Sequence, residues 1–135
     1  MDLITCFVVL HHVADLHSIL LELVRILRSN GYLILREHDC KTERSLTNKY
    51  LNFVHAFMRI TKVGEFAHLK TDVTPDWKSQ KAEIIKDTSS IQYRTRQQWQ
   101  KELENVGFRL LAEWDYSGSS GPQNLFYAAY QLNKK

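Results

Sequence analysis

The chain has 135 residues, of which 44% are hydrophobic and 24% charged, with a formal net charge of +3. These values are those of one soluble globular domain, because a chain of this length can bury a single core. The small positive charge does not indicate nucleic-acid binding, since acidic residues are interspersed among the basic ones.

Other features of the sequence exclude further classes of protein. No apolar stretch approaches the roughly 20 residues that a membrane span needs, and the N-terminus lacks the pattern of a secretory signal. Cys6 and Cys40 are too few for a disulfide framework and are expected to be free thiols. We therefore expect an intracellular, soluble protein in the cytoplasm.

The beginning of the chain predicts a strand–helix–strand unit. The apolar run Leu3–Leu10 is typical of a buried strand, and Asp15 stands where a helix N-cap belongs. Apolar residues then recur at helical spacing at Ile19, Leu20, Leu23, Val24 and Leu27. Asn30 and Gly31 are expected to end this helix, since glycine readily adopts a left-handed C-cap conformation. A second strand over Tyr32–Leu35 would then lie parallel to the first.

The middle of the chain predicts two helices separated by an irregular segment. Apolar residues at three- and four-residue steps indicate an amphipathic helix over Thr42–Ile60. Residues 61–94 show no regular pattern, and could either cover a substrate or bind a partner. Thr95 and Gln98 match a capping box at the start of the next helix, which Gly107 is expected to end.

Two strands are predicted at the end of the chain. They cover Arg109–Tyr116 and Leu125–Leu132, and the turn-rich residues 117–122 separate them. The last strand is rich in aromatic residues, which favour a sheet.

Three passages near the start of the chain resemble the class I S-adenosylmethionine-dependent methyltransferases. They are DLITCFVVLHHVAD (2–15), LLELVRILRSNGY (20–32) and LILREHD (33–39), and they are similar to that family's fourth strand, following helix and fifth strand. Residues 95–132 are similar to the family's ending. The resemblance implies an α/β, partial Rossmann-like methyltransferase fold with parallel strands, one antiparallel strand and helices on both faces. The implied order of the strands in the sheet is first, second, fourth, third.

The resemblance covers only the second half of the family's domain. The family holds S-adenosylmethionine with a Gly-x-Gly-x-Gly loop and an acidic residue in its first half, and this sequence contains no Gly-x-Gly. We therefore expect residues 1–135 to form a single truncated domain that does not bind the cofactor alone.

The resemblance also implies which residues would face the cofactor. Cys6, Phe7 and His11 would lie where the first strand meets the methionine end of S-adenosylmethionine. The alternative is that Cys6 and Phe7 pack in the core, and that His11 serves packing and capping.

Three polar residues follow the second strand, where a methyl acceptor would lie. They are Glu37, His38 and Asp39, and a carboxylate or imidazole there could accept a proton as the acceptor attacks the methyl carbon. We predict that these are the catalytic residues if the domain is catalytic. Methyl transfer depends mainly on alignment, so a strong base need not be involved.

Histidines near the ends of the first two strands could in principle form a metal site. His11, His12, His38 and Asp39 would meet at adjacent strand ends, and imidazole suits zinc. However, the sequence has no His-x-x-x-His or Cys-x-x-Cys spacing. The sequence therefore predicts no metal site.

Two functions follow from the resemblance and the missing half. The leading hypothesis is a methyltransferase-like protein that is non-catalytic alone and serves as a structural or interaction subunit of a larger assembly. The alternative is a fragment or subunit of an active S-adenosylmethionine-dependent methyltransferase whose cofactor-binding half is missing here. A nucleic-acid-binding module has only the mild basicity in its favour.

The expected partner is another polypeptide. The outer edge of the strand Leu3–Leu10 has no predicted neighbour and carries no lysine or proline to protect it. We expect it to pair with a copy of the chain or with a second protein. The REHD ending of the second strand is also similar to methyltransferase-like proteins of large DNA viruses, which would make the chain a virion component.

Overall fold

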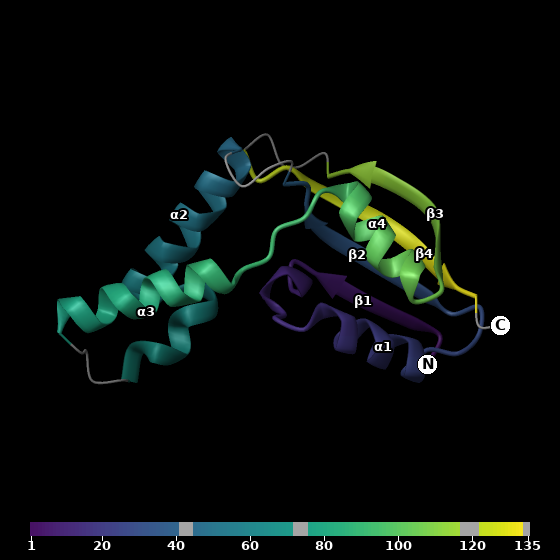
Figure 1. Ribbon diagram of the computed structural model, residues 1–135, viewed down its shortest axis with the longest axis horizontal. Helices are drawn as coiled ribbons and strands as arrows, with labels where there is room; N and C mark the ends of the chain where they lie inside the picture. Colours follow the sequence, from purple (N-terminus) through teal and green to yellow (C-terminus); the bar gives the residue numbers. More distant parts are fainter. Residues whose placement is uncertain (41–44, 72–75, 117–121, 134–135) are drawn as a thin grey trace.

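The computed structural model describes residues 1–40, 45–71, 76–116 and 122–133, and Figure 1 shows the arrangement of their elements. The short segments η1 and η2 are 3-10 helices. In chain order the elements are β1 (Leu3–Phe7), η1 (Leu10–His12), α1 (Leu16–Ile26), β2 (Tyr32–His38), α2 (Leu46–Thr61), η2 (Gly64–Thr71), α3 (Trp77–Ser90), α4 (Arg96–Asn105), β3 (Phe108–Asp115) and β4 (Leu125–Leu132). No helix in these ranges is long and apolar enough to cross a membrane.

The four strands form one mixed sheet in the order β1-β2-β4-β3. The strands β1 and β2 are parallel, with Cys6 opposite Leu35, and β4 runs antiparallel to both of its neighbours. This confirms the predicted insertion of the last strand between the two before it. It also confirms the α/β class and the strand order.

The core lies on one face of the sheet. Side chains alternate along β2 and β4, so that Leu33, Leu35, Ala128 and Tyr130 are buried on the same side. Helices α1 and α4 cover this side and contribute their own buried residues, which include Leu20, Trp99 and Leu103. Burying a side chain of this size stabilises the fold by roughly 1.5–3 kcal/mol, so this layer contains most of the hydrophobic stabilisation.

The opposite face of the sheet carries partly exposed apolar side chains. Leu3, Phe7, Tyr32 and Trp114 all belong to the alternate positions of their strands and are exposed. The sequence predicts helices on both faces of the sheet. In the structure α1 and α4 share one face, because the same alternating set of apolar strand positions packs against these two helices. Helices α2 and α3 instead lie beyond the carboxyl ends of β1 and β2 (Figure 1).

The boundaries of the first two strands differ from the prediction. Strand β1 ends at Phe7 rather than Leu10, because Val8 turns the chain with a φ of 54° and Leu10 begins η1. Strand β2 continues to His38, three residues beyond the predicted Leu35. The longer β2 thus includes Glu37 and His38 as strand residues.

The end of α1 is also formed differently from the prediction. Asp15 caps the start, its carboxylate accepting from Ser18 N at 3.1 Å, as expected. However, the helix ends at Ile26, and Asn30 rather than Gly31 takes the left-handed conformation, with a φ of 62°. Gly31 is needed for space, because a Cβ there would lie 2.7 Å from Leu27 Cγ.

Residues 61–94, where the sequence showed no pattern, contain η2 and α3. Helix α3 has a clear N-cap at Asp76 but no buried residue, and so it lacks the apolar stripe that would reveal it. Arg59 of α2 holds α3 against α2 through ion pairs of 2.8 Å to both Glu83 and Asp87. The predicted helix over Thr42–Ile60 is α2, capped by Ser45. The start of that prediction and the loop over 117–121 lie outside the described residues.

Candidate functional site

Polar side chains gather at the carboxyl ends of β1 and β2. Glu37 and His38 come from the end of β2, and His11 and His12 come from η1, which follows β1. Ligands of open α/β sheets bind at this end of the strands. The candidate site therefore lies at this end of the sheet.

Glu37 is fully buried and accepts three hydrogen bonds. Its Oε1 accepts from the backbone amides of Val9 at 3.1 Å and Leu10 at 2.8 Å, and its Oε2 lies 2.7 Å from His11 Nδ1. Because a carboxylate only accepts, His11 Nδ1 carries the proton and donates. Glu37 thus fastens the end of β2 to the turn after β1, and its oxygens are occupied.

The turn that Glu37 holds is strained. Val8 has a φ of 54°, a left-handed conformation that a β-branched residue rarely adopts. The amide of Val8 donates to Arg36 O at 2.7 Å, so β2 holds the turn by its backbone as well. Such strain persists only where neighbouring contacts determine the backbone, as Glu37 and Arg36 do here.

His38 is buried beside this turn. Its Nδ1 donates to the carbonyl oxygen of Gln123 at 2.7 Å, which leaves Nε2 as an acceptor. Burial lowers the pKa of His38, so the imidazole is neutral near pH 7. Of the three predicted catalytic residues, His38 has a ring nitrogen that this bond leaves available.

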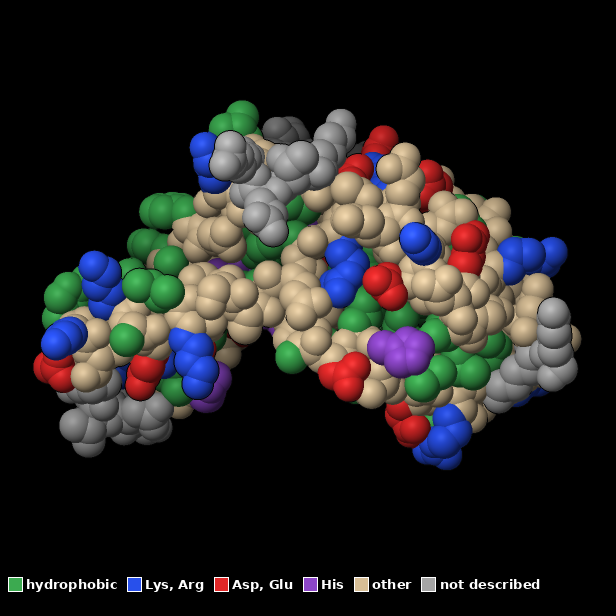
Figure 2. Space-filling model, in the orientation of Figure 1, with side chains coloured by type: hydrophobic (Ala, Val, Ile, Leu, Met, Phe, Trp, Pro, Cys, Tyr) green, Lys and Arg blue, Asp and Glu red, His purple; other side chains and the backbone are tan. Residues whose placement is uncertain are grey.

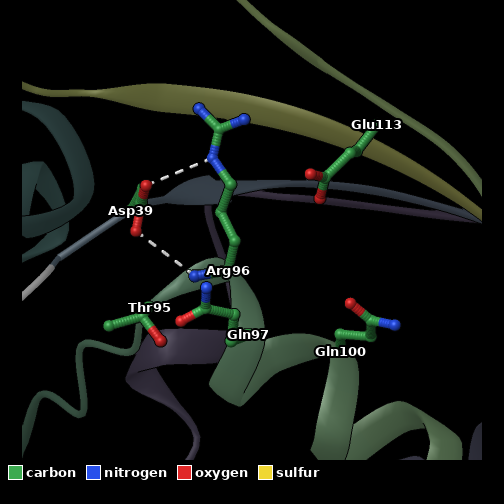
Figure 3. A pocket seen from close by; sticks show the side chains of 6 residues that line it. All are labelled: Asp39, Thr95, Arg96, Gln97, Gln100 and Glu113. Atoms are coloured by element: carbon green, nitrogen blue, oxygen red, sulfur yellow. Dashed lines mark hydrogen bonds and ion pairs between the residues drawn. The ribbon is translucent and has the colours of Figure 1, made fainter.

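Asp39 joins the end of β2 to the start of α4. Its carboxylate accepts from the backbone N and the side-chain Nε of Arg96, each at 3.2 Å (Figure 3). Arg96 also pairs with Asp115 through Nη2. A pocket of about 330 Å³ beside this pair is lined by polar residues that include Gln100 and Glu113. Asp39 therefore contacts α4 and is separate from the Glu37–His11 pair.

The three residues predicted to face the cofactor do not converge. The Cys6 side chain is buried under the helices, where burial and the charge of Glu37 raise the pKa of its thiol. Phe7 lies on the opposite face, its ring edge-on to Tyr127 at 6.0 Å and under the Arg36 guanidinium. His11 is turned inward to Glu37. Their role toward S-adenosylmethionine stays a prediction.

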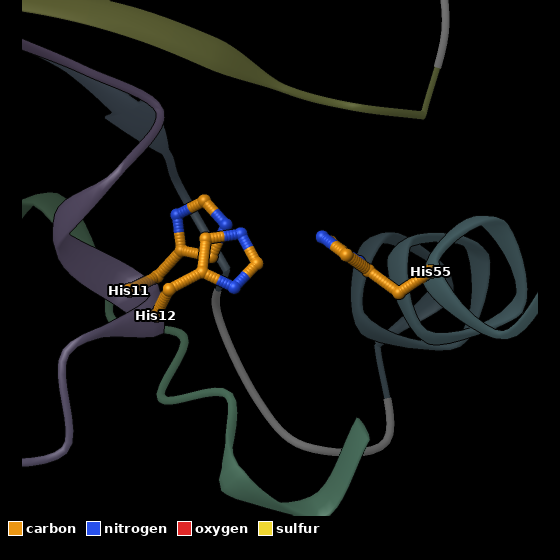
Figure 4. A group of neighbouring side chains, drawn as sticks. All are labelled: His11, His12 and His55. Carbon is orange, nitrogen blue, oxygen red and sulfur yellow. The ribbon is translucent and has the colours of Figure 1, made fainter. Parts of the chain in front are cut away.

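Sequence reasoning missed three residues of this region. His55 of α2 points from its helix toward His11 and His12 (Figure 4), and its Nδ1 lies 2.8 Å from Leu51 O and 2.9 Å from the Tyr93 hydroxyl. Glu65 of η2 faces His12 and His55. Burial lowers the pKa of both His12 and His55, and it raises that of Tyr93. These residues are far from His11 in the sequence, so no local motif links them to it. Glu65 and Tyr93 also lie within residues 61–94, which show no regular pattern.

A pocket lies between these residues and the end of β2. It has a volume of about 370 Å³, and its lining includes His12, His38, His55 and Glu65 together with Val54. Apolar residues of α2 and three imidazoles both contribute to its lining. The pocket can hold a small molecule with both apolar and hydrogen-bonding groups.

The sequence matches a known protein family over most of its length. A family model described as a methyltransferase domain matches residues 1–113. No curated protein sequence matches the chain.

Solved structures share the fold at low sequence identity. An S-adenosylmethionine-dependent methyltransferase from Methanosarcina mazei is 15% identical, with a TM-score of 0.57, over 100% of this chain and 60% of its own. The CurJ carbon methyltransferase is 18% identical, with a TM-score of 0.55, over 98% of this chain and 30% of its own. A structure described as a pericyclic reaction enzyme is 11% identical, with a TM-score of 0.53, over 98% and 26%. The chain thus spans between 26% and 60% of the length of these relatives.

Proposed function

Since the chain belongs to the methyltransferase domain family, we propose that it is an interaction subunit that pairs with another polypeptide through β1 and is non-catalytic alone. The partner is a polypeptide that extends the sheet beyond β1. The observation that carries this proposal is the outer edge of that strand, which pairs with no other strand of the described residues.

Two hydrogen bonds at the ends of β1 fix which of its residues bond to β2. Tyr32 N donates to Asp2 O at 2.8 Å, and Val8 N donates to Arg36 O at 2.7 Å. In a parallel ladder, alternate residues of a strand bond to the same neighbour. The even-numbered residues of β1 therefore bond to β2.

The odd-numbered residues of β1 present their backbone to the outer edge. The amides and carbonyls of Leu3, Thr5 and Phe7 point away from β2, and no strand lies beside them in the described part of the chain. Leu3 is 51% and Phe7 44% exposed. An apolar, unprotected edge of this kind readily accepts another strand.

The exposed face of the sheet supports the same proposal. Besides Leu3 and Phe7, the large side chains of Tyr32 and Trp114 are exposed there. The solved relatives are longer than this chain, and so their folds include further segments. A partner that extends the sheet and covers this face would bury both the outer edge of β1 and these apolar side chains.

The experiment compares two substitutions at Thr5 by light scattering. Without its natural partner, the chain is expected to pair edge to edge with a copy of itself. Thr5→Pro removes the outward amide and leaves the bonds to β2 intact, whereas the control Thr5→Val retains that amide. We expect the chain and Thr5→Val to form dimers or larger species at about 100 µM, since edge pairing is concentration-dependent, and Thr5→Pro to be monomeric. A monomeric parent chain, or assembly unchanged in Thr5→Pro, would contradict the proposal.

The second candidate function is half of an active methyltransferase whose other half binds the cofactor. The pocket beside His38 favours it, because it lies at the end of the sheet where such a fold would bind its acceptor. The DNA upstream of the Met1 codon provides the test. An in-frame segment with an acidic residue and Gly-x-Gly-x-Gly would support this function, and a stop codon there would exclude a single-chain enzyme.

A further inference from the structure

Histidines of η1 and α2 form a cluster beyond the carboxyl end of β1. We propose that His11, His12, His55 and Glu65 bind one zinc ion. One ring nitrogen from each of the three histidines lies within 4.8 Å of the others. Figure 4 shows His55 reaching from α2 toward the rings of His11 and His12.

His11 has the arrangement of a zinc ligand. Its ring is 1% exposed, and Nδ1 donates to Glu37 Oε2 at 2.7 Å. Its Nε2 is buried and has no hydrogen-bond partner among the described residues. Metal-binding histidines commonly donate one ring N–H to a carboxylate, which orients the ring and raises the basicity of the other nitrogen. A metal ion on Nε2 would satisfy this otherwise costly buried acceptor.

His55 repeats this arrangement from the other side. Its Nδ1 donates to Leu51 O at 2.8 Å, with the Tyr93 hydroxyl also close at 2.9 Å. The Nε2 is therefore the acceptor, and it lies 3.5 Å from a Glu65 oxygen. Two of the three rings are thus fixed with Nε2 available to a ligand.

Glu65 provides the fourth ligand. Its second oxygen lies 3.3 Å from His12 Nε2, so one carboxylate faces both His12 and His55. Three imidazoles and a carboxylate are donors that Zn²⁺ prefers in tetrahedral sites. Zinc–nitrogen bonds of about 2.1 Å would place the nitrogens about 3.4 Å apart, which requires the three histidine rings, whose ligand atoms now lie within 4.8 Å of one another, to close by up to about 1.4 Å.

The bound ion would connect three segments that are far apart in the sequence. His11 and His12 belong to η1 after β1, His55 to α2, and Glu65 to η2. Such a site would fasten the helices that lie beyond the sheet onto its carboxyl end. Its role would be structural, because four protein ligands leave no open position.

The test measures Zn²⁺ binding to the full chain by competition with a chromophoric chelator. We expect one ion per chain with a Kd of about 1 µM or tighter, and a rise in Tm of about 5–10 °C when zinc is saturating. Co²⁺ in place of zinc should give the visible absorption of a tetrahedral site. His12→Gln and His55→Gln should each weaken zinc binding more than about tenfold.

His17→Gln is the matched control, because His17 is an exposed histidine of α1 outside the cluster. Circular dichroism establishes that each variant is folded before binding is compared. Absence of zinc binding at about 100 µM, or equal binding by the double variant His12→Gln/His55→Gln, would overturn the proposal. Equal weakening by His17→Gln would assign binding to scattered histidines and would overturn it as well.

Discussion

At the scale of single residues, Glu37 has a structural role that its sequence position does not reveal. The sequence predicts a polar residue at the end of a strand, and Glu37 is one. Its partners Val9 and Leu10 are 28 and 27 residues away, and their amides depend on the left-handed turn at Val8. A local pattern cannot show such a turn, because valine is among the residues least expected to form it. The geometry therefore explains Glu37 as the residue that holds the strained turn.

A stability measurement tests this role of Glu37. Glu37→Gln replaces one accepting oxygen by a donor amide and leaves a buried polar group without its partner. We expect the free energy of unfolding to fall by about 1–3 kcal/mol in urea denaturation. Glu113→Gln, at an exposed position of β3, should change it by less than about 0.5 kcal/mol. An unchanged midpoint for Glu37→Gln would show that the carboxylate is not needed for the fold.

At the scale of helices and strands, the sequence predicts features that depend on nearby residues, and it does not predict features that depend on packing. The capping box at Thr95 is present with both of its hydrogen bonds, because its partners lie within three residues. Helix α3 was missed because nothing in it is buried. The end of α1 was misplaced because Gly31 serves close packing on Leu27 rather than the helix terminus.

Substitution of Thr95 tests the contribution of this cap. Thr95→Ala removes the oxygen that accepts from Gln98 N at 3.1 Å. We expect the free energy of unfolding to fall by about 0.5–2 kcal/mol, and Thr95→Ser, which keeps the hydroxyl, to recover most of it. Chemical denaturation measures both. Equal losses in the two variants would assign the effect to packing instead of capping.

At the scale of the whole molecule, the described residues form a core on one face of the sheet and place no strand beside the outer edge of β1. The sheet order, the parallel pair and the antiparallel last strand follow from the resemblance and are confirmed. The arrangement of α1 and α4 on one face, which leaves the other exposed, could not be predicted from residue patterns. In the space-filling view of Figure 2, basic and acidic side chains are interspersed over this molecule, and no stripe of one sign crosses the face shown.

The glycine content of the sequence and the positions of three residues lead to a prediction about cofactor binding. We expect no saturable binding of S-adenosylmethionine to residues 1–135 in isothermal titration calorimetry. The sequence has no Gly-x-Gly, and Cys6, Phe7 and His11 do not share a surface. Losing several hydrogen bonds of roughly 0.5–1.5 kcal/mol each would turn a micromolar site into a millimolar one. A micromolar Kd for this chain alone would refute this prediction.

The most direct test of pairing through β1 is amide hydrogen exchange, resolved by residue with NMR at low and high protein concentration. In the dilute monomer, Ile4 and Cys6 should exchange slowly because they bond to β2, and Leu3, Thr5 and Phe7 should exchange fast. On assembly, the amides of Leu3, Thr5 and Phe7 should become protected. A chain that stays monomeric at the high concentration, with these three amides still exchanging fast, would contradict the account.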